Sequence, residues 1–424
     1  MKYKIMTLGC KVNEYESEVI SNLLENHGYI KSDDPDVCII NTCTVTNTAD
    51  SKSRKMIRSL KRKYPEAIIV AMGCMIQNKK DDNLPVDIVI GNKNKTEIVN
   101  LLDEYNGKSI YNVEDIMQQT SFEDMSLNNF DLTRAYIKIE DGCDNYCSYC
   151  IIPYVRGHVR SKRHEKVIQE AEKLIKDGHK EIVLTGIHTG HYHDGNYSFA
   201  DLLKDLVKLE GLKRLRISSI EITEINNDVL DVIQNSDVLV NHMHIPLQSG
   251  SDEILKQMNR KYDKKYFINK IKKIKEIKPD MNVTTDVIVG FPGETNEQFD
   301  ECINTINEIG FTKIHVFPYS DRKGTKASEM SNKIPGNIKK LRVRRLLDIS
   351  KELEIGYMNK HIGSETIFIP EVYEDGYLIG HTSNYLLIKA RGDKSLLTKE
   401  VTVKISKIVY PYLISDIKNF ELSK

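Results

Sequence analysis

Apolar and polar residues are arranged along the first part of the chain in two different periods. Three short apolar runs are typical of buried strands, and two segments repeat apolar positions at helical spacing. The strands are expected at residues 3–8, 37–41 and 67–72, and the helices at 14–26 and 51–63. Strands that alternate with helices form parallel sheets with helices on their faces. The pattern therefore predicts an N-terminal parallel α/β domain over residues 1–120.

The same two periods continue in the middle of the chain. Six strand-like runs are expected at residues 135–140, 181–187, 214–219, 242–247, 282–290 and 313–319. Amphipathic helices are expected between them at residues 166–176, 199–209, 264–277 and 296–309. Six βα units predict a partial (β/α)6 barrel, with its chemistry at the carboxyl ends of the strands. Together with a basic helix at 337–358, this central domain is expected to span residues 132–360.

The segments on either side of the expected barrel follow other patterns. Residues 104–129 are acidic and rich in Asn, Gln and Ser without periodicity, which favours a linker. Over residues 361–424, apolar residues recur at every second position, as in Val401 and Val403. This alternation predicts half-buried strands. We expect these strands to form a small antiparallel β-barrel of OB-like type, an architecture that suits nucleic-acid binding.

Composition and charge limit the possible partners. The chain carries 61 basic and 61 acidic residues, so nucleic-acid binding would rest on local basic patches. Two expected helices carry such patches, which are either solvated faces or RNA contacts: Lys52, Arg54, Lys55, Arg58, Lys61, Arg62 and Lys63 on one, and Lys339, Lys340, Arg342, Arg344 and Arg345 on the other. No apolar stretch approaches membrane-span length, and no secretory leader is recognised. We therefore expect a cytoplasmic protein without a membrane partner.

The positions of the cysteines carry the clearest chemical information. Eight cysteines in a chain expected inside the cell favour metal or redox chemistry over disulfides. Cys143, Cys147 and Cys150 form a CxxxCxxC triplet just after the first expected barrel strand. Three thiolates at this spacing hold three irons of a [4Fe–4S] cluster and leave the fourth iron open. A structural zinc site is the alternative, although it normally needs a fourth ligand.

Three further cysteines follow the three N-terminal strands. Cys10, Cys43 and Cys74 each lie shortly past the end of one strand. Because the carboxyl ends of parallel strands meet at one edge of a sheet, these side chains can converge despite their separation in sequence. Cys38 and Cys302 lie within apolar patterns, and we expect them to be small core residues.

The segment that contains the CxxxCxxC triplet reads EDGCDNYCSYCIIPYVRGHVRSKR. It resembles the cluster-binding loop of radical S-adenosylmethionine (SAM) enzymes, and specifically that of the methylthiotransferases. Five residues after the triplet match that family: Pro153, Arg156, Gly157, Ser161 and Arg163. The resemblance implies that SAM binds the open iron and is cleaved to a radical that removes hydrogen from carbon.

The resemblance also implies that side chains on the barrel rim hold SAM. The expected contacts are one residue inside the triplet and three that follow later strands: Tyr149, Glu221, Gln248 and Val289. Ordinary rim residues are the alternative for each of them. Three neighbouring histidines have a spacing that a metal would accept, but a polar loop is favoured because no acidic or thiol partner accompanies them: His188, His191 and His193.

The resemblance extends over nearly the whole chain. The methylthiotransferases join an N-terminal domain with three cysteines, a radical-SAM barrel and a C-terminal TRAM domain of OB-like type. Cys10, Cys43 and Cys74 occupy the motifs that bind a second [4Fe–4S] cluster in that family, and this cluster handles the sulfur. Three ligands again leave an iron open, which suits the binding of a sulfur donor.

Within the family, TLGCKVNEYESE and NTCTVTNTADSKSR are most similar to the branch that methylthiolates carbon 2 of N6-threonylcarbamoyladenosine beside the tRNA anticodon. The sister branches read GCQMN and NTCAVRE for isopentenyladenosine, or GCPKN and NTCGFI for an aspartate of a ribosomal protein. The expected partners are the tRNA anticodon stem-loop, an electron donor and a sulfur source. The alternatives are a sister substrate or, from another class, a non-catalytic iron–sulfur protein that binds RNA or senses redox state.

Overall fold

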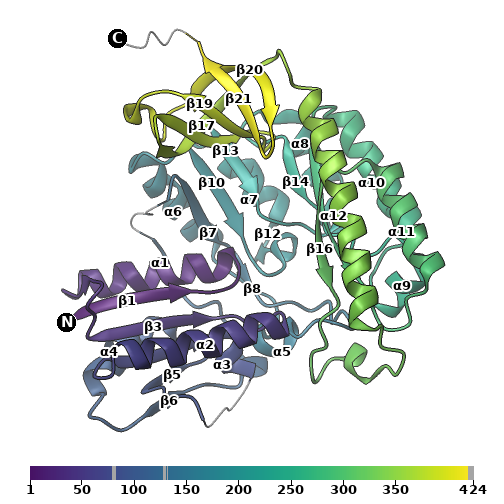
Figure 1. Ribbon diagram of the computed structural model, residues 1–424. Coiled ribbons are helices and arrows are strands. Elements are labelled where there is room, and N and C mark those ends of the chain that lie inside the picture. Colours follow the sequence, from purple (N-terminus) through teal and green to yellow (C-terminus); the bar gives the residue numbers. More distant parts are fainter. Residues whose placement is uncertain (79–82, 128–129, 131, 419–424) are drawn as a thin grey trace.

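A computed structural model describes residues 1–78, 83–127, 130 and 132–418, and Figure 1 shows three successive parts. The first is a parallel sheet with strand order β2-β1-β3-β4-β5-β6. Its strands are β1 (Lys2–Thr7), β2 (Ile30–Lys31), β3 (Val37–Thr42), β4 (Ile68–Gly73), β5 (Ile88–Ile90) and β6 (Ile110–Asn112). Its helices are α1 (Lys11–Asn26), α2 (Asn47–Lys63), α3 (Cys74–Asn78) and α4 (Ile98–Glu104). The predicted parallel α/β architecture is confirmed.

The segment 104–129, expected as a linker, instead belongs to the folded structure. Strand β6 pairs with β5 at the sheet edge, and Met125 and Leu127 are buried in the core of the second part. A three-residue edge strand and two isolated apolar anchors leave no periodic pattern, which explains why the sequence did not reveal them. Asn128 and Asn129 lie outside the described residues.

The second part contains all six predicted barrel strands. They are β7 (Arg134–Lys138), β10 (Glu181–Thr185), β13 (Arg214–Ile217), β14 (His242–His244), β15 (Asn282–Val289) and β16 (Lys313–Pro318). They form two three-stranded parallel sheets, β13-β10-β7 and β14-β15-β16, which meet at a bridge between Leu215 and Leu239. Strand β14 is shorter than expected, because Pro246 has no N–H for a further ladder bond.

Helices cover the outside of these two sheets. The longer ones are α6 (His164–Lys176), α7 (Phe199–Leu206), α8 (Asn227–Asn235), α9 (Asp252–Gln257), α10 (Lys264–Ile277) and α11 (Asn296–Ile309). Shorter elements in this part are α5 (Ile152–Arg156), β8 (Glu140–Asp141), β9 (Arg160–Ser161), β11 (His193–Asp194) and β12 (Tyr197–Ser198). Across the described chain, short 3-10 helices occur at η1 (Lys95–Glu97), η2 (Ile116–Gln118), η3 (Thr189–His191), η4 (Ile222–Glu224), η5 (Lys326–Glu329) and η6 (Lys394–Leu396).

Cys38 and Cys302 are buried, as predicted.

The long helix α12 (Gly336–Asn359) packs along β16 and leads into the third part, which is a closed barrel (Figure 1). Its strands are β17 (Glu365–Glu374), β18 (Tyr377–Thr382), β19 (Leu387–Arg391), β20 (Val401–Val409) and β21 (Tyr412–Ile417), in the order β17-β18-β19-β21-β20. Val401 and Val403 face the interior, as predicted. The β19–β21 pair is parallel rather than antiparallel. Alternation fixes the buried face of a strand but carries no information about the direction of its partner.

The closed barrel lies over the amino-terminal ends of the β7, β10 and β13 strands. Arg214 donates hydrogen bonds of 2.9 Å to the carbonyls of His381 and Ile367, and Arg134 forms an ion pair of 3.2 Å with Glu371. The cysteine loops lie at the opposite, carboxyl ends of the barrel strands. Across the described residues, no helix has both the length and the apolar character needed to cross a membrane.

Candidate active site

The CxxxCxxC loop is folded tightly against the chain that follows it. Gly142 has a φ of +93°, and a Cβ atom there would lie 1.9 Å from the carbonyl oxygen of His158. The Cys143 N–H donates to the Gly157 carbonyl at 3.0 Å, and the Cys150 N–H donates to the Cys147 carbonyl at 2.9 Å. Glycine is therefore required at position 142 by both backbone geometry and space.

The three thiols of this loop are half-buried and lie near one another. Burial is the main cause that raises the pKa of Cys150 to about 12, and the neighbouring Cys147 thiol raises it further. Burial also raises the pKa of Cys143, with contributions from Cys150 and Cys147. Each thiolate makes ionisation of its neighbours harder. A positive metal centre removes this penalty, so the three thiols are suited to bind one metal centre together. The donor set fits an iron–sulfur cluster.

Residues far along the chain hold this loop in place. The Ser148 hydroxyl donates to the Gln257 carbonyl at 2.8 Å, and Asn259 donates to the Tyr146 carbonyl at 3.0 Å. Arg260 donates to the Cys147 sulfur at 3.3 Å. The sequence did not indicate this role for the segment after α9, because it lies more than a hundred residues from the triplet and has no motif of its own.

Two of the four predicted SAM residues line one cavity beside the loop. Tyr149 and Gln248 border a cavity of about 190 Å³, together with Cys150, Asp286 and, from the N-terminal part, Thr46. Gln248 has a φ of +64°, and its N–H and carbonyl bond to β15. This backbone pairing fixes where the Gln248 side chain leaves the strand end.

The other two predicted SAM residues are placed differently. Glu221 lies on the Cys147 side of the loop and forms an ion pair with Arg260. Val289 is fully buried in the barrel core, and its carbonyl accepts a 2.8 Å hydrogen bond from the Tyr319 N–H. Its neighbour Ile288 lines the cavity instead. A two-residue period explains this outcome, because adjacent residues of a strand face opposite sides.

The three N-terminal cysteines come together at the carboxyl edge of the first sheet. Cys10 precedes α1, Cys43 follows β3, and Cys74 begins α3. A Cβ atom on Gly9 would lie 3.2 Å from the Cys43 sulfur. Burial raises the pKa of Cys43 to about 11, and the Cys74 and Cys10 thiols raise it further. This second set of three soft donors also fits an iron–sulfur cluster.

Asn13 fastens two of these cysteine loops together. Its side-chain amide donates to the Leu8 carbonyl at 2.7 Å and to the Thr42 carbonyl at 3.0 Å. Leu8 precedes Cys10 in the chain, and Thr42 precedes Cys43. Because one buried amide satisfies carbonyls from both loops, their separation is fixed before any metal binds.

Arg156 connects the two cysteine sites and is fully buried. Its Nε donates to the Cys74 sulfur at 3.2 Å, although the residue lies just after the other triplet, in α5. Its Nη1 donates to Glu16 at 2.6 Å and its Nη2 to Asn13 at 2.8 Å. The sequence indicated Arg156 as part of a family motif, but its partners on α1 left no signal.

The buried charges around Arg156 are predominantly positive. Glu16 also pairs with Lys95 at 2.9 Å and with Lys138 at 2.8 Å, and Lys138 pairs with Asp141 at 2.7 Å. Burial alone would raise the pKa of Glu16, but Arg156, Lys138 and Lys95 hold it well below its usual range. Three cations against two carboxylates leave positive charge beside Cys74, which matches a site that carries negative charge when occupied.

Two of the three neighbouring histidines have an acidic partner that the sequence did not indicate. His188 contacts the Glu224 carboxylate, His191 lies 3.6 Å from the same carboxylate, and the three side chains could together hold a metal ion. The His188 ring nitrogen Nδ1 lies 3.7 Å from the Cys143 sulfur. Glu224 follows a different strand, so its distance in sequence hid the contact. The exposed His193 does not belong to this group.

Comparison with family models assigns the chemistry of the central part. The model described as Radical SAM superfamily matches residues 137–306, which include the CxxxCxxC loop, and the model described as Uncharacterized protein family UPF0004 matches residues 2–91. The fold is also similar to that of the radical S-adenosylmethionine methyltransferase TsrM from Kitasatospora setae, with a TM-score of 0.57, 14% identity and 77% of each chain covered.

Relatives with known names cover almost the whole chain. The threonylcarbamoyladenosine tRNA methylthiotransferase MtaB of Bacillus subtilis is 44% identical, over 96% of this chain and 94% of the relative, and that of Thermotoga maritima is 38% identical over 90% of each. A tRNA-2-methylthio-N(6)-dimethylallyladenosine synthase of Clostridium botulinum is 36% identical over 96% of this chain and 94% of the relative. The chain therefore belongs to the family of radical SAM tRNA methylthiotransferases, and the resemblance inferred from its motifs is confirmed.

Proposed function

We propose that this protein methylthiolates carbon 2 of N6-threonylcarbamoyladenosine next to the anticodon of tRNA, using SAM and two [4Fe–4S] clusters. The observation that carries the proposal is the pair of three-cysteine sites held together through Arg156, in a chain 44% identical to an enzyme named for this reaction. When bound, the clusters and SAM supply the electron, the methyl group and the hydrogen-abstracting chemistry.

The residues of the chain bind, orient and shield these groups. Three cysteines hold the radical-SAM cluster: Cys143, Cys147 and Cys150. Three hold the auxiliary cluster: Cys10, Cys43 and Cys74. Tyr149 and Gln248 contact SAM from the walls of the cavity beside Cys150, whereas Glu221 acts from the other side through its contact with Arg260. Val289 supports the strand end from the core.

The partner of this reaction is the anticodon stem-loop of tRNA, and α2 offers a surface for it. A groove along this helix is lined by Lys55, Arg58, Lys61 and Arg62, whose cations would displace the counterions condensed on the RNA phosphates. The basic patch on α12 is less available, because Arg342 is buried against Glu294 at 2.5 Å. The electron donor and the sulfur source are further partners, and a tRNA substrate places the enzyme in the cytoplasm.

The product on tRNA tests the proposal directly. Nucleosides from tRNA of cells with and without the gene are compared by mass spectrometry, and 2-methylthio-N6-threonylcarbamoyladenosine is expected only where the gene is present. A methylthiolated isopentenyladenosine would overturn the substrate but keep the reaction. An unchanged tRNA profile would favour a protein substrate and contradict the proposal.

Two cysteine variants separate the roles of the two clusters. In reconstituted protein, Cys147→Ala is expected to abolish reductive cleavage of SAM, because it removes a ligand of the radical-SAM cluster. Cys43→Ala is expected to retain cleavage and to lose insertion of sulfur. Both products are quantified by chromatography and mass spectrometry. Normal methylthiolation by Cys43→Ala would refute the assignment of the auxiliary site.

A further inference from the structure

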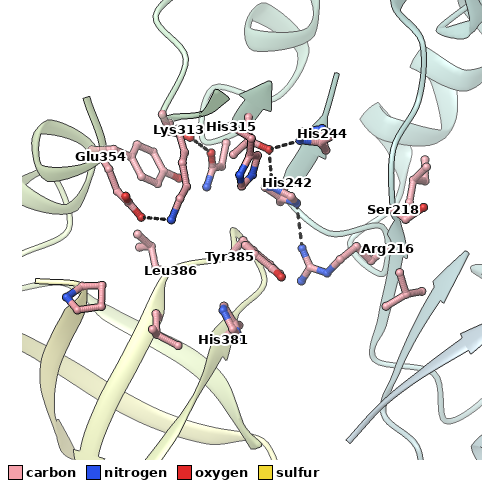
Figure 2. A pocket seen from close by; sticks show the side chains of 18 of the residues that line it. Arg216, Ser218, His242, His244, Lys313, His315, Glu354, His381, Tyr385 and Leu386 are labelled. Carbon is pink, nitrogen blue, oxygen red and sulfur yellow. Dashed lines mark hydrogen bonds and ion pairs between the residues drawn. The ribbon is translucent and has the colours of Figure 1, made fainter. Parts of the chain in front are cut away.

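A second, larger cavity lies between all three parts of the molecule. Its volume is about 360 Å³, within the range of sites for small molecules. Lys11 of the N-terminal part, Arg216 and His242 of the central part, and Tyr385 of the C-terminal barrel contribute to its wall, and Figure 2 shows the last three of these converging on it. The cavity is therefore complete only when the three parts are assembled.

This cavity adjoins both cysteine sites. Asp286 lines it and also lines the smaller cavity that contains Cys150. On the other side, Lys11 follows Cys10 directly in the chain. Among the described residues, no cysteine lines the larger cavity; it extends from the amino-terminal ends of the barrel strands to Asp286 and Lys11, so a group bound in it approaches both cysteine sites from the barrel interior.

Most charged side chains of the wall are already paired within the protein. Arg216 donates to Glu181 at 2.7 Å, Lys313 to Glu354 at 2.9 Å, and Arg134 to Glu371 at 3.2 Å. On the far wall, His244 lies 3.2 Å from Asp286. Each of these charged side chains is neutralised by its partner, so the pairs offer little net charge to a ligand in the cavity.

Lys11 is the exception among the charged residues of the wall. Over the described residues, its side chain has no hydrogen bond and no ion pair. It is also the first residue of α1, where the positive end of the helix dipole disfavours a cation. Neither packing nor helix formation explains a lysine here, so its ammonium group is available for an anion in the cavity.

Although Arg134 and Arg216 are paired, the groups around the Tyr385 hydroxyl favour negative charge at that place. Burial alone would raise the pKa of the Tyr385 phenol, but Arg134, Lys11 and Arg216 lower it below its usual value. The Arg216 guanidinium lies 4.8 Å from the Tyr385 ring, and Figure 2 shows both facing the cavity. An anionic group bound here would meet one free cation and a hydroxyl donor.

We propose that Lys11 recognises the carboxylate of the threonylcarbamoyl group of the substrate, with the Tyr385 hydroxyl as a second donor. This inference rests on the proposed function. The threonylcarbamoyl group carries a carboxylate, a hydroxyl and a urea, whereas an isopentenyl group carries only apolar carbon. A partly buried carboxylate needs a charge-assisted partner, and among the described residues of the cavity wall Lys11 is the cation without an ion pair.

The test varies the lysine and the carboxylate together. Anticodon stem-loops that carry N6-threonylcarbamoyladenosine, or its carboxamide analogue, are given to the reconstituted full-length enzyme, and kcat/KM is measured for both. The parent is expected to prefer the acid by roughly 10- to 100-fold, the range for a hydrogen bond to a charged group. Lys11→Gln is expected to reduce this preference to below about threefold, and Lys11→Arg to keep most of it.

Control measurements separate recognition from damage to the neighbouring cluster. Lys204→Gln removes a half-buried surface lysine on α7, in a different part of the molecule, and is expected to keep the parent's preference. Iron content and SAM cleavage without RNA are measured for every variant, because Lys11 adjoins Cys10. The affinities of the two stem-loops, measured without turnover, give a second readout. If Lys11 binds the carboxylate, the ratio of the acid affinity to the amide affinity falls in Lys11→Gln; if Lys11 has only a structural role, this ratio stays the same.

Two outcomes would overturn the inference. If Lys11→Gln keeps the parent's ratio, or loses acid and amide substrates equally, Lys11 does not bind the carboxylate, while the proposed function stands. If the parent modifies isopentenyladenosine and neither threonylcarbamoyl substrate, the proposed function and the inference fail together. The parent's own activity on the acid therefore distinguishes the two failures.

Discussion

Arg156 is a buried charged side chain whose hydrogen bonds connect the two cysteine sites. A guanidinium without solvent is costly unless its donors are all engaged, and here they reach a carboxylate, an amide oxygen and a cysteine sulfur. A lysine would supply one point of charge, whereas the planar fork supplies donors in fixed directions. The residue thus sets the distance between α5, which follows one cysteine triplet, and α1, which follows Cys10.

Replacement of Arg156 by alanine is expected to destabilise the protein strongly. The change removes hydrogen-bond donors from buried Glu16, which keeps Lys95 and Lys138, and from buried Asn13, and each acceptor left unsatisfied costs about 1–3 kcal/mol. Thermal unfolding and iron content of the purified variant measure the effect. The matched control is Arg345→Ala, because Arg345 forms an exposed 2.7 Å ion pair with Asp300 that is worth roughly 0–1 kcal/mol. Equal effects of the two substitutions would refute the role of Arg156.

His242 is expected to make stability depend on pH. Burial, followed by the neighbouring Arg216, holds the pKa of His242 well below its usual value, so the folded protein keeps the ring neutral. The unfolded chain binds a proton below about pH 6.5, so stability is lost as the pH falls below that value, by up to about 1.4 kcal/mol per pH unit. His242→Asn removes this term and loses two hydrogen bonds, to Arg216 and Thr284.

The melting temperatures of the parent and of His242→Asn measure this dependence. The variant is expected to melt at a lower temperature than the parent at pH 7.5. The difference between the two melting temperatures is expected to be smaller at pH 5.5, because only the parent loses stability through protonation of this ring. His244, His381 and Lys11 also face the ring but are retained in both proteins, so they cancel in the difference. A gap of the same size at both pH values would contradict the expectation.

At the scale of elements, strands and loops were predictable to different degrees. All six barrel strands and the alternation in β20 followed from apolar periods, because burial of one face or of a whole strand leaves a repeating pattern. The short β5 and β6 were not predicted, since three residues give no period. Helix α8 was not predicted either, although its buried apolar residues follow helical spacing: Val229, Leu230, Val232 and Ile233. The cysteine loops were located by their motifs. Their conformation depends on contacts with distant residues, which leave no periodic pattern in the sequence.

Gly142→Ala tests the closure of the CxxxCxxC loop. The added carbon would collide with the His158 carbonyl, so the loop cannot fold as in the parent, and iron at the radical-SAM site is expected to be lost while the barrel stays folded. Iron content, SAM cleavage and circular dichroism measure these effects. Gly178→Ala is the control, because Gly178 has a φ of +103° with nothing within 4 Å, so it adds only backbone strain of roughly 1–3 kcal/mol. Full SAM cleavage by Gly142→Ala would disprove the steric argument.

At the scale of the whole molecule, the fold class was predictable but the assembly of the parts was not. The order of the parallel α/β domain, the barrel and the β-barrel follows from local patterns and from family motifs. The larger cavity is made of residues from each part, such as Lys11 and Tyr385, whose proximity depends on docking. Docking uses single buried side chains such as Arg214, which look like any other charged residue in the sequence.

Arg214→Ala is expected to loosen the C-terminal barrel without unfolding it. The substitution removes the donors to the His381 and Ile367 carbonyls, two part-buried hydrogen bonds from a charged group that contribute about 1.5–3 kcal/mol each at most. Hydrogen exchange in strands β17 and β18 is expected to accelerate, whereas exchange in β10 is expected to stay slow. Arg391→Ala, at an exposed position of β19, is the control. Unchanged exchange in Arg214→Ala would show that other contacts dominate docking.

Because all three parts contribute to the wall of the larger cavity, the cavity is completed late in the synthesis of the chain. By the time synthesis has passed α12, both cysteine triplets have been made, yet the β18–β19 turn that carries Tyr385 has not. A nascent chain at that stage has the thiols for two clusters but no complete pocket in which a base is held and shielded from water. On the proposed function, reactivity toward RNA is thereby deferred until the chain has been made through Tyr385.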